Sequence, residues 1–441
     1  MNIYHYLKNK KILHIYSSLL PSFWMTVEYI WNPLLLFIAT PYLLRSLGAE
    51  GFGFWMLFSG TLGFGVAVNS GTSIAIIKQI SACIGLSERK EINSIVCKSL
   101  AVAIYGGGVL AAIIFTIFGF FGELLFSRMG DPHIIFMTGF FCAILIWVEQ
   151  IDNVFGSTLK GAEKFSYAAR IELVGKALQI TSVVIAALIF KDVLVLYQFF
   201  LFFGVIRLLL KMWLVRALLE VVSFTPNFFG LHNTIHIAKW GWVQGIGGLF
   251  FGTIDRMLIG GFLGASSLTS YSIATQLAVQ IHAIPSAFFG VVFPRISREL
   301  SDDKNYSIRQ IAKLTILGNI ILSTFLALAL LVYGENIIML WVGVSQAEDS
   351  GLVFKCLIIA YWLLSINVAP HFLMLGIGRY RFLSLSNIVA GIVSLMLMCM
   401  LIQEFELIGV GIARIAYGII IFINCFSLYE YLKNQTKKYA K

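Results

Sequence analysis

The sequence is poor in charged residues and in the short motifs of soluble enzymes. Only 12% of its 441 residues are Asp, Glu, Lys or Arg, which is about half the share in soluble globular proteins. It has no phosphate-binding loop, no HExxH zinc motif and no nucleophile–base pair at a suitable spacing. These absences disfavour ATP-driven export and catalysis, and they predict neither a cofactor nor a metal site.

Paired cysteines and a cleavable leader are also missing. The six cysteines lie in or beside apolar runs, and none has CxxC or CxxxC spacing. We therefore expect them to be small buried hydrophobic residues, not disulfides or metal ligands. The N-terminal segment MNIYHYLKNKKILH and the apolar run after it have no small-residue cleavage site, so we expect this segment to be retained.

Long apolar runs dominate the chain. Hydrophobic residues make up 59% of the sequence, the mean hydropathy is +0.87, and runs of roughly 18 or more apolar residues recur throughout. The sequence therefore predicts an all-α polytopic membrane protein with about 12 transmembrane helices. The expected spans are 23–46, 53–77, 96–120, 133–157, 167–190, 193–217, 238–262, 268–292, 310–333, 354–376, 382–402 and 407–431. No connection between them is long enough to form a soluble catalytic domain.

The chain repeats itself after about half its length. Leu47-Gly48-Ala49 recurs as Leu263-Gly264-Ala265, which puts Trp55 opposite Tyr271. Farther on, Gly161, Lys164 and Phe165 match Gly378, Arg381 and Phe382 at nearly the same offset. Common loop patterns are the alternative explanation, but span count and topology favour two pseudo-symmetric six-helix bundles, with a substrate site between them. We expect an N-terminal bundle over 1–217, a cytoplasmic linker over 218–237 and a C-terminal bundle over 238–441.

Basic residues are distributed unevenly between the two sides of the predicted membrane. Most of the 32 lysines and arginines fall on the side of both termini, whereas the other side has Arg45, Arg128, Lys191 and Lys355. Cytoplasmic segments carry the excess of positive charge, so we expect both termini in the cytoplasm. The net charge of +10 follows from this bias. It predicts contact with membrane lipids, including anionic headgroups at the tail NQTKKYAK, and no nucleic-acid partner.

Charged residues inside the predicted spans are the candidate functional residues. A charge at membrane depth costs roughly 2.5–3.5 kcal/mol on insertion scales, so it is expected to face other protein or a wet cavity. Asp255 and Arg256 lie in span 238–262, Arg414 in the last span, and Lys176 near the middle of the fifth. Asp255 and Arg256 point about 100° apart on a helix, so neither is the other's main partner. Arg256 and Arg414 have no suitably spaced acid on their own helix, which favours binding of an anionic substrate.

Acidic residues in the spans are candidates for ion coupling. Glu149 and Asp152 are three residues apart on one helix face, and like charges so close need a cation or a proton between them. The alternative is that this pair reaches the cytoplasmic interface. Asp255 and Glu28 complete the acidic set. For Lys176, an ion pair with Glu172 on its own helix is the alternative to a substrate role.

Several motifs resemble one family of membrane transporters. The stretch PYLLRSLGAEGFGFW, residues 41–55, looks like the first-hairpin signature of Wzx-type O-antigen flippases. These flippases belong to the polysaccharide-transport branch of the multidrug/oligosaccharidyl-lipid/polysaccharide (MOP) exporter superfamily. DRMLIG at 255–260, with Leu263-Gly264 and Tyr271, is similar to the seventh span of that family, and GAEKF at 161–165 and Phe293-Pro294 fit as well. The resemblance covers essentially the whole chain, with one departure at Asn69, where relatives often have an acid.

This resemblance implies a MATE-like fold, alternating access and a cationic lumen. The implied substrate is an undecaprenyl-pyrophosphate-linked oligosaccharide, an O-antigen repeat unit, moved from the cytoplasmic to the periplasmic leaflet of a bacterial inner membrane. In this interpretation the anionic head meets the lumen cations Arg256, Arg414, Lys176 and Arg45. Protons or Na⁺ are the expected coupling ions, and other polysaccharide-assembly membrane proteins are further partners.

Two alternatives stay open at this point. A multidrug or cation antiporter of the same superfamily would need acidic residues that face the substrate. An integral-membrane O-antigen polymerase or glycosyltransferase usually carries a large external loop with arginines, whereas the external connections here are short and poor in them.

Overall fold

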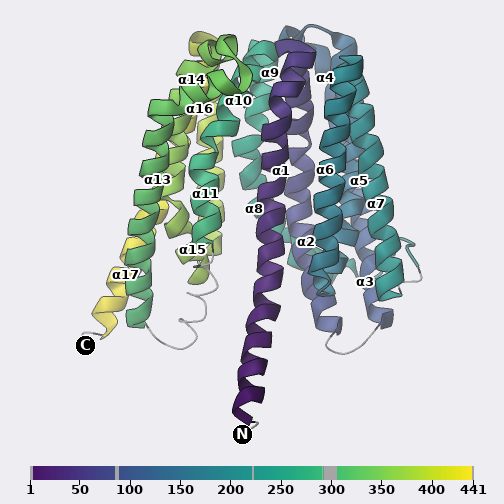
Figure 1. The fold of residues 1–441 in the computed structure, drawn as a ribbon, viewed down its shortest axis with the longest axis vertical. Coiled ribbons are helices and arrows are strands. Elements are labelled where there is room, and N and C mark those ends of the chain that lie inside the picture. Colours follow the sequence, from purple (N-terminus) through teal and green to yellow (C-terminus); the bar gives the residue numbers. More distant parts are fainter. Residues whose placement is uncertain (1–2, 85–88, 221–222, 291, 293–304, 440–441) are drawn as a thin grey trace. The chain divides into compact units, whose positions relative to one another are not determined.

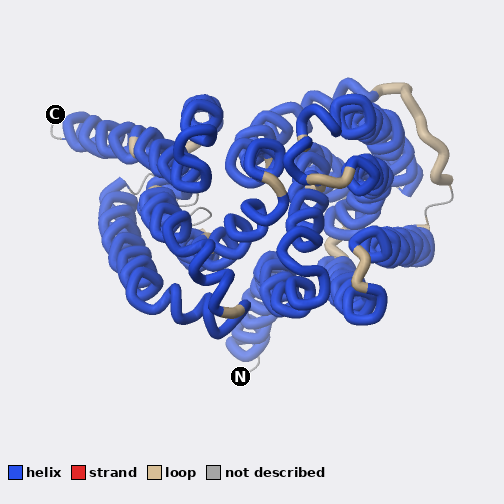
Figure 2. Tube along the Cα trace, turned by 90° about the horizontal axis from the view of Figure 1, so that it is seen from above, coloured by secondary structure: helices blue, strands red, loops and turns tan. Residues whose placement is uncertain are grey.

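The computed structural model describes residues 3–84, 89–220, 223–290, 292 and 305–439. Between residues 3 and 30 the described side chains are those of Trp24 and Val27, so the side chain of Glu28 lies outside the described part of the chain. Phe293 and Pro294 lie outside it as well. Within this part the regular structure is helical and contains no strand (Figure 2), which confirms the all-α prediction.

Most neighbouring helices of the described residues follow one another through short connections (Figure 1). Asp192 caps one of them, the helix that begins at Val193, by accepting a hydrogen bond from Leu194 N at 2.8 Å. Pro132 begins another, at a position where the missing N–H has no intrahelical partner to lose. In chain order the elements are α1 Ile3–Thr61, α2 Gly63–Ile84, α3 Arg89–Ala101, the π-helical segment η1 Val102–Gly106, α4 Gly107–Leu125, the 3-10 turn η2 Ser127–Met129, α5 Pro132–Gly161, α6 Phe165–Phe190, α7 Val193–Leu219, α8 Leu231–Gly252, α9 Ile254–Leu263, α10 Ala265–Ala278, α11 Gln280–Phe289, α13 Asn305–Val342, α14 Val344–Ile366, α15 Val368–Gly376, α16 Tyr380–Ile421 and α17 Ile423–Tyr439.

Nine helical stretches of the described residues are long and apolar enough to cross a membrane. They are fewer than the expected spans because two stretches, Trp31–Cys83 and Arg381–Tyr431, each overlap two of those spans. The expected span 268–292 corresponds to α10 and α11, which are each too short to cross alone. The chain is therefore a multi-pass membrane protein, as predicted.

The two LGA turns have nearly the same backbone conformation. Gly48 interrupts α1 with φ 71° and ψ 179°, and Gly264 joins α9 to α10 with φ 87° and ψ −177°. This region of backbone conformation is essentially restricted to glycine. Trp55 and Tyr271, which the repeat puts opposite each other, are both buried. The two turns are thus structurally equivalent, as the internal repeat predicts.

The second match of the repeat holds in a different register. Glu163 between α5 and α6 has φ 59°, and Gly378 between α15 and α16 has φ 81°. In both turns the next residue donates its N–H to the carbonyl oxygen five residues earlier at 2.9 Å, as in a Schellman helix end. The structure therefore aligns Gly378 with Glu163, two residues from the expected match at Gly161. Matching identical residues gave the wrong register, because the residue at positive φ is glutamate in one turn and glycine in the other.

Contacts divide the chain into two compact units, each assembled from separate segments. Unit 1 is Met1–Gly48, Phe64–Gly122 and His133–Gly245, and unit 2 is Ala49–Gly63, Glu123–Pro132 and Ile246–Lys441. Short early segments join the later half of the chain in unit 2, where Thr269 donates a hydrogen bond to Ala49 O at 2.6 Å. The units therefore have other boundaries than 1–217 and 238–441, and the division into two six-helix bundles stays a prediction.

Unit 1 combines close glycine contacts with an apolar interior. A methyl group added at Gly241 of α8 would lie 2.4 Å from Gly71 Cα of α2, and one added at Gly245 would lie 2.3 Å from Ala67 O. Helices in a bilayer gain little from the hydrophobic effect, so close packing of this kind and polar contacts hold them together. Buried side chains of α2, α3, α5 and α7 form the interior, among them Ile76, Ile80, Val96, Val154, Phe155 and Val215.

Unit 2 contains two broken helices whose freed carbonyl groups are satisfied by side chains. α10 and α11 meet at Val279, and α14 and α15 meet at Asn367. Asn319 of α13 donates to the carbonyl oxygens of Ser365 and of the next residue at 2.9 and 3.0 Å. Ser365 Oγ in turn donates to Ile281 O at 2.7 Å. These bonds replace the water that a bilayer does not provide.

The cysteines agree with the expectation only in part. All six are free, and Cys83, Cys97 and Cys142 are buried. Cys356 and Cys425 are partly buried, and Cys399 is exposed, so the expected burial is wrong for Cys399.

Candidate functional site

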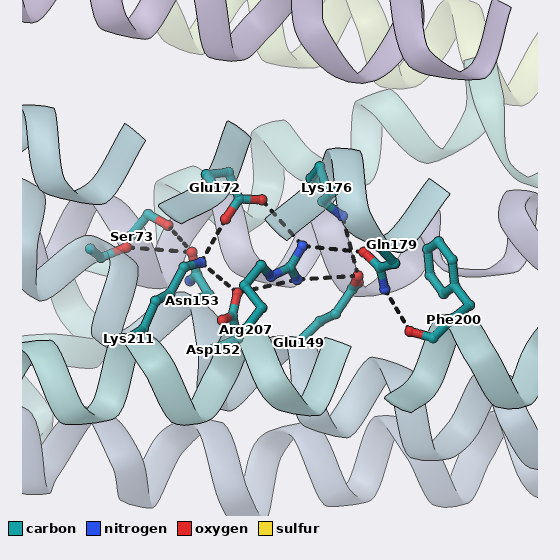
Figure 3. A network of polar contacts seen from close by, with 11 residues as sticks. Ser73, Glu149, Asp152, Asn153, Glu172, Lys176, Gln179, Phe200, Arg207 and Lys211 are labelled. Atoms are coloured by element: carbon teal, nitrogen blue, oxygen red, sulfur yellow. Dashed lines mark hydrogen bonds and ion pairs between the residues drawn. The ribbon is translucent and has the colours of Figure 1, made fainter. Parts of the chain in front are cut away.

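Three helices of unit 1 bring charged side chains together. α5 carries Glu149 and Asp152, α6 carries Glu172 and Lys176, and α7 carries Arg207 and Lys211 (Figure 3). Spacings of three and four residues put each pair on one face of its helix. We call these six residues the charge cluster.

Lys211 lies at the centre of the charge cluster. Its Nζ is 2.7 Å from Asp152 Oδ2 and 2.6 Å from Glu172 Oε2. The side chain of Lys211 is 5% exposed, and that of Asp152 is 6% exposed. An unpaired ion in such an interior costs several kcal/mol, so these short contacts stabilise the charged forms of all three groups.

Arg207 connects the acids of α5 with the acid of α6. Its guanidinium nitrogen atoms lie 3.3 Å from Asp152 Oδ2, 3.9 Å from Glu149 Oε1 and 3.4 Å from Glu172 Oε1. Arg207 is therefore a cation within 4 Å of both Glu149 and Asp152. It supplies the positive charge that the sequence predicts between these two acids. It comes from another helix of the same unit.

Two uncharged residues of α6 hold Arg207 in this position. Arg207 Nη1 donates to Gln179 Oε1 at 3.5 Å, and Gln179 Nε2 donates to Phe200 O at 2.7 Å. A methyl group at Gly175 would lie 2.9 Å from Arg207 Cδ. Glycine at this position thus lets the arginine stem pass close to the α6 backbone.

Lys176 completes the cluster at its more exposed side. Its Nζ is 3.8 Å from Glu149 Oε1, and its side chain is 19% exposed. Glu172 contacts Arg207 and Lys211 of α7, whereas the described ion pairs do not join it to Lys176 on its own helix. With three acids and three bases, the charge cluster as a whole is electrically neutral.

The charge cluster lines a cavity of about 300 Å³ inside unit 1. This volume is at the lower end of the range for small-molecule sites, about 300–1,000 Å³. Asp152 Oδ1 and Arg207 Nε are buried and have no hydrogen-bond partner among the described residues. Such atoms normally bind water or a ligand, so we interpret the cavity as a polar site. The remaining polar lining residues are Asn69, Ser73, Asn153, Ser157 and Lys160.

This arrangement can bind an anion through an exchange of partners. Arg207 and Lys211 can transfer their hydrogen bonds from Asp152 and Glu172 to an entering anionic group, because all four side chains line the same cavity. The two released carboxylates then need a proton or another cation. Anion binding and cation uptake are therefore linked by the geometry of the cluster.

A second buried ion pair lies in unit 2. Arg414 Nη2 of α16 contacts Asp255 Oδ2 of α9, and both side chains are 1% exposed. Tyr271 of α10 donates its hydroxyl proton to Asp255 Oδ2 at 2.5 Å and accepts a hydrogen bond from Arg414 Nε at 3.1 Å. The guanidinium of Arg414 is thus engaged inside unit 2 and joins three helices.

The other predicted site residues belong to neither group. Arg256 is partly buried and packs on Gly60, where an added methyl would lie 2.8 Å from Arg256 Cδ. Arg45 is exposed near the end of the first part of α1. Neither arginine forms an ion pair with another described residue. The structure thus brings Glu149, Asp152 and Lys176 together, but it leaves Arg256 and Arg45 outside the cluster.

Arg207 and Lys211 are the site residues that sequence reasoning did not identify. The distribution of basic residues puts both on the side of the termini, although they lie within the apolar stretch from Val193 to Leu219. One signal was available, because their spacing of four residues matches that of Glu172 and Lys176. Two bases on one helix face at membrane depth require acids on a neighbouring helix.

The chain matches a known protein family over more than half of its length. Residues 21–300 match the family described as polysaccharide biosynthesis protein. The matched segment includes the whole charge cluster.

Two curated relatives extend the similarity to most of the chain. A putative O-antigen transporter of Shigella flexneri is 22% identical over 409 residues, which cover 89% of this chain and 93% of the relative. A probable low-salt glycan biosynthesis flippase of Haloferax volcanii is 21% identical over 388 residues, which cover 88% of this chain and 78% of the relative. These relatives are a transporter and a flippase, not enzymes.

Solved structures have the same fold. A multidrug resistance MATE-family transporter of the MOP superfamily, in an inward-facing conformation, matches with a TM-score of 0.74 at 14% identity and covers 93% of this chain and 99% of its own. A MOP superfamily transporter of Pyrococcus furiosus matches with a TM-score of 0.59 at 13% identity and covers 96% of each chain. The expected MATE-like fold is therefore confirmed. The chain belongs to the polysaccharide biosynthesis protein family and has the fold of the MOP superfamily.

Proposed function

We propose that this protein is a flippase for an undecaprenyl-pyrophosphate-linked oligosaccharide. It moves this substrate from the cytoplasmic to the periplasmic leaflet of a bacterial inner membrane by alternating access. Membership of the polysaccharide biosynthesis family and similarity to an O-antigen transporter and a glycan flippase support the substrate class. The uneven distribution of basic residues supports a cytoplasmic location of both termini.

The observation that carries the proposal is the pair of buried cations, Arg207 and Lys211, that line a polar cavity. Packing alone does not require them, because replacing a buried ion network with apolar residues of similar volume is often neutral or stabilising by about 1–4 kcal/mol. Guanidinium and ammonium groups bind phosphate and carboxylate oxygen atoms well. Arg207, Lys211 and Lys176 are therefore our candidates for binding the pyrophosphate or an acidic sugar.

The neutral balance of the charge cluster links binding of the anionic head to uptake of a cation. When the anionic head binds to Arg207 and Lys211, these two bases release the carboxylates of Asp152 and Glu172. The released carboxylates then take up H⁺ or Na⁺. Release of the head restores the internal ion pairs and releases the cation on the same side, so the cation travels in the same direction as the head. Glu149, which Arg207 also contacts, takes part in the same exchange.

The predicted residues outside the cluster receive separate roles. Asp255 and Arg414 stabilise unit 2 through their ion pair, so we assign them neither substrate binding nor ion coupling. Arg256 and Arg45 remain proposed secondary contacts for the anionic head.

A deletion strain tests the proposal. Loss of the protein should cause lipid-linked oligosaccharide to accumulate on the cytoplasmic leaflet, and the wild-type gene should restore export. The double variant Lys211→Met/Asp152→Asn removes one base and one acid, so the cluster stays neutral while the cavity loses a cation. We expect this variant to reach the membrane and to export roughly 10–100 times more slowly, as for the loss of a charged hydrogen bond. Wild-type export by the folded double variant contradicts the site.

Charge reversal tests the secondary contact. Arg256→Glu should abolish export while leaving the protein in the membrane, because it turns a proposed attraction for the head into repulsion. Full export by Arg256→Glu removes this residue from the proposed site.

A multidrug or cation antiporter is the second candidate, because three acids line the same cavity. This function predicts resistance to cationic dyes on overexpression and its loss in Glu172→Gln. The flippase predicts no change in dye resistance and no accumulation of lipid-linked oligosaccharide once the wild-type gene is supplied.

A further inference from the structure

The cavity of the charge cluster has a second, uncharged wall. Asn69 and Ser73 come to it from α2, and Asn153 and Ser157 come from α5. Ser73 Oγ donates to Asn153 Oδ1 at 2.8 Å, and Ser157 Oγ lies 3.4 Å from the same oxygen. We call these four residues the amide wall. Figure 3 shows Ser73 and Asn153 beside Lys211 of the charge cluster.

The amide wall keeps hydrogen-bonding capacity that the described protein groups do not use. Asn69 Oδ1 is buried and has no hydrogen-bond partner among the described residues. Asn153 Nδ2 makes one long contact, 3.5 Å to Asn69 O, which exceeds the usual hydrogen-bond distance. Buried polar groups are rarely left in this state without water or a ligand.

The chemistry of the wall complements the chemistry of the cluster. Carboxamides and hydroxyls both donate and accept, as sugar hydroxyl groups do. They carry no charge, so they can bind the uncharged part of a ligand whose anionic group binds the charged lining residues. The cavity therefore places the cations Arg207 and Lys211 next to neutral hydrogen-bonding groups.

We propose that the amide wall binds the hydroxyl groups of a sugar whose anionic group is bound by Arg207 and Lys211 in the same cavity. This inference rests on the proposed flippase function and narrows its substrate to a glycan with an anionic group on a hydroxyl-bearing ring. A phosphate on the sugar and an acidic sugar both have this chemistry. The cavity of about 300 Å³ is small for a ligand site, so it holds the anionic end of the glycan and not the whole oligosaccharide.

Binding of soluble probes to the purified full-length protein tests the inference. The probes are glucose 1-phosphate, glucuronic acid, inorganic phosphate and glucose. We expect glucose 1-phosphate to bind at least about tenfold more tightly than inorganic phosphate, because the amide wall adds two or more neutral hydrogen bonds. Asn153→Ala should reduce this preference about three- to tenfold and leave the affinity for inorganic phosphate unchanged. The ratio of the affinities for glucuronic acid and glucose 1-phosphate shows whether the site prefers an acidic sugar or a sugar phosphate.

Two serines of α2 provide a matched control. Ser73 faces Asn153 in the cavity, whereas Ser70 Oγ lies 2.9 Å from Gly241 O of α8. Ser73→Ala should lower the affinity for glucose 1-phosphate, and Ser70→Ala should not. Ser73→Ala also provides a second test should Asn153→Ala fail to fold.

Several outcomes would overturn the inference. They are equal binding of glucose 1-phosphate and inorganic phosphate by the wild type, no binding of any probe, and an unchanged preference in both Asn153→Ala and Ser73→Ala. Failure of the flippase proposal is seen separately, in the deletion strain, because the binding assay uses no lipid-linked substrate.

Discussion

Replacing Lys211 with methionine should destabilise the protein far more than the same replacement at Lys355. Both lysines form short ion pairs: Lys211 with Asp152 at 2.7 Å and Glu172 at 2.6 Å, and Lys355 with Glu335 at 2.9 Å. They differ in burial, because the side chain of Lys211 is 5% exposed and that of Lys355 is 53% exposed. Methionine keeps an unbranched apolar stem, so the comparison isolates the buried charge.

Burial determines the expected magnitude. Removing one partner of a buried pair leaves an uncompensated charge and costs about 3–5 kcal/mol, whereas an exposed pair contributes about 0–1 kcal/mol. Arg207 still contacts Asp152 and Glu172 at 3.3 and 3.4 Å, so we expect the lower end for Lys211→Met, about 3 kcal/mol. For a domain of roughly 150–250 residues this lowers the midpoint of thermal unfolding by about 6–12 °C.

Thermal unfolding of the purified protein in detergent measures both changes. Lys355→Met should stay within about 4 °C of the wild type. Adding Asp152→Asn to Lys211→Met restores the neutrality of the cluster and should recover at least half of the lost stability. Equal midpoints for the two single variants, or a further fall in the double variant, would refute the reasoning from burial.

Three other substitutions test the remaining contacts. Arg414→Gln should lower the unfolding midpoint about as much as Lys211→Met, because it leaves Asp255 buried without its cation; adding Asp255→Asn should recover part of the loss, and an unchanged midpoint in Arg414→Gln would contradict the buried pair. Gly264→Ala should lower the free energy of unfolding more than Gly48→Ala. Strain at positive φ costs about 1–3 kcal/mol at each position, but only at Gly264 would the new methyl lie 2.6 Å from a carbonyl oxygen. Equal losses of stability would contradict the steric argument. Gly175→Val should displace the guanidinium beside it and weaken binding of glucose 1-phosphate about tenfold; a wild-type affinity would show that this close approach does not position the guanidinium.

The helical fold follows from features that are local in the sequence. Apolar runs of sufficient length define the spans, and Gly48 and Gly264 mark equivalent turns because only glycine accepts their backbone conformation without strain. The breaks inside two expected spans were not predictable in the same way. Apolar residues continue through the breaks at Val279 and Asn367. The side chains that satisfy the freed carbonyl groups come from distant positions such as Asn319.

The candidate site was predictable only in part. Glu149, Asp152 and Lys176 are recognisable as charges at membrane depth. Lys211 is not, because a long basic side chain near the end of an apolar run can reach the interface as well as the interior. The partner of Arg414 is 159 residues away in the sequence, so no spacing rule on one helix identifies it.

Flipping by the purified protein in liposomes tests most directly whether the buried cations of the charge cluster bind the anionic head. Lipid-linked oligosaccharide is placed in one leaflet, and the rate at which its sugars become accessible on the other side is measured for the wild type and for Lys211→Met/Asp152→Asn. We predict that the double variant flips at least about tenfold more slowly although much of its thermal stability is restored. A double variant that is folded and flips at the wild-type rate would contradict the assignment of the charge cluster as the substrate site.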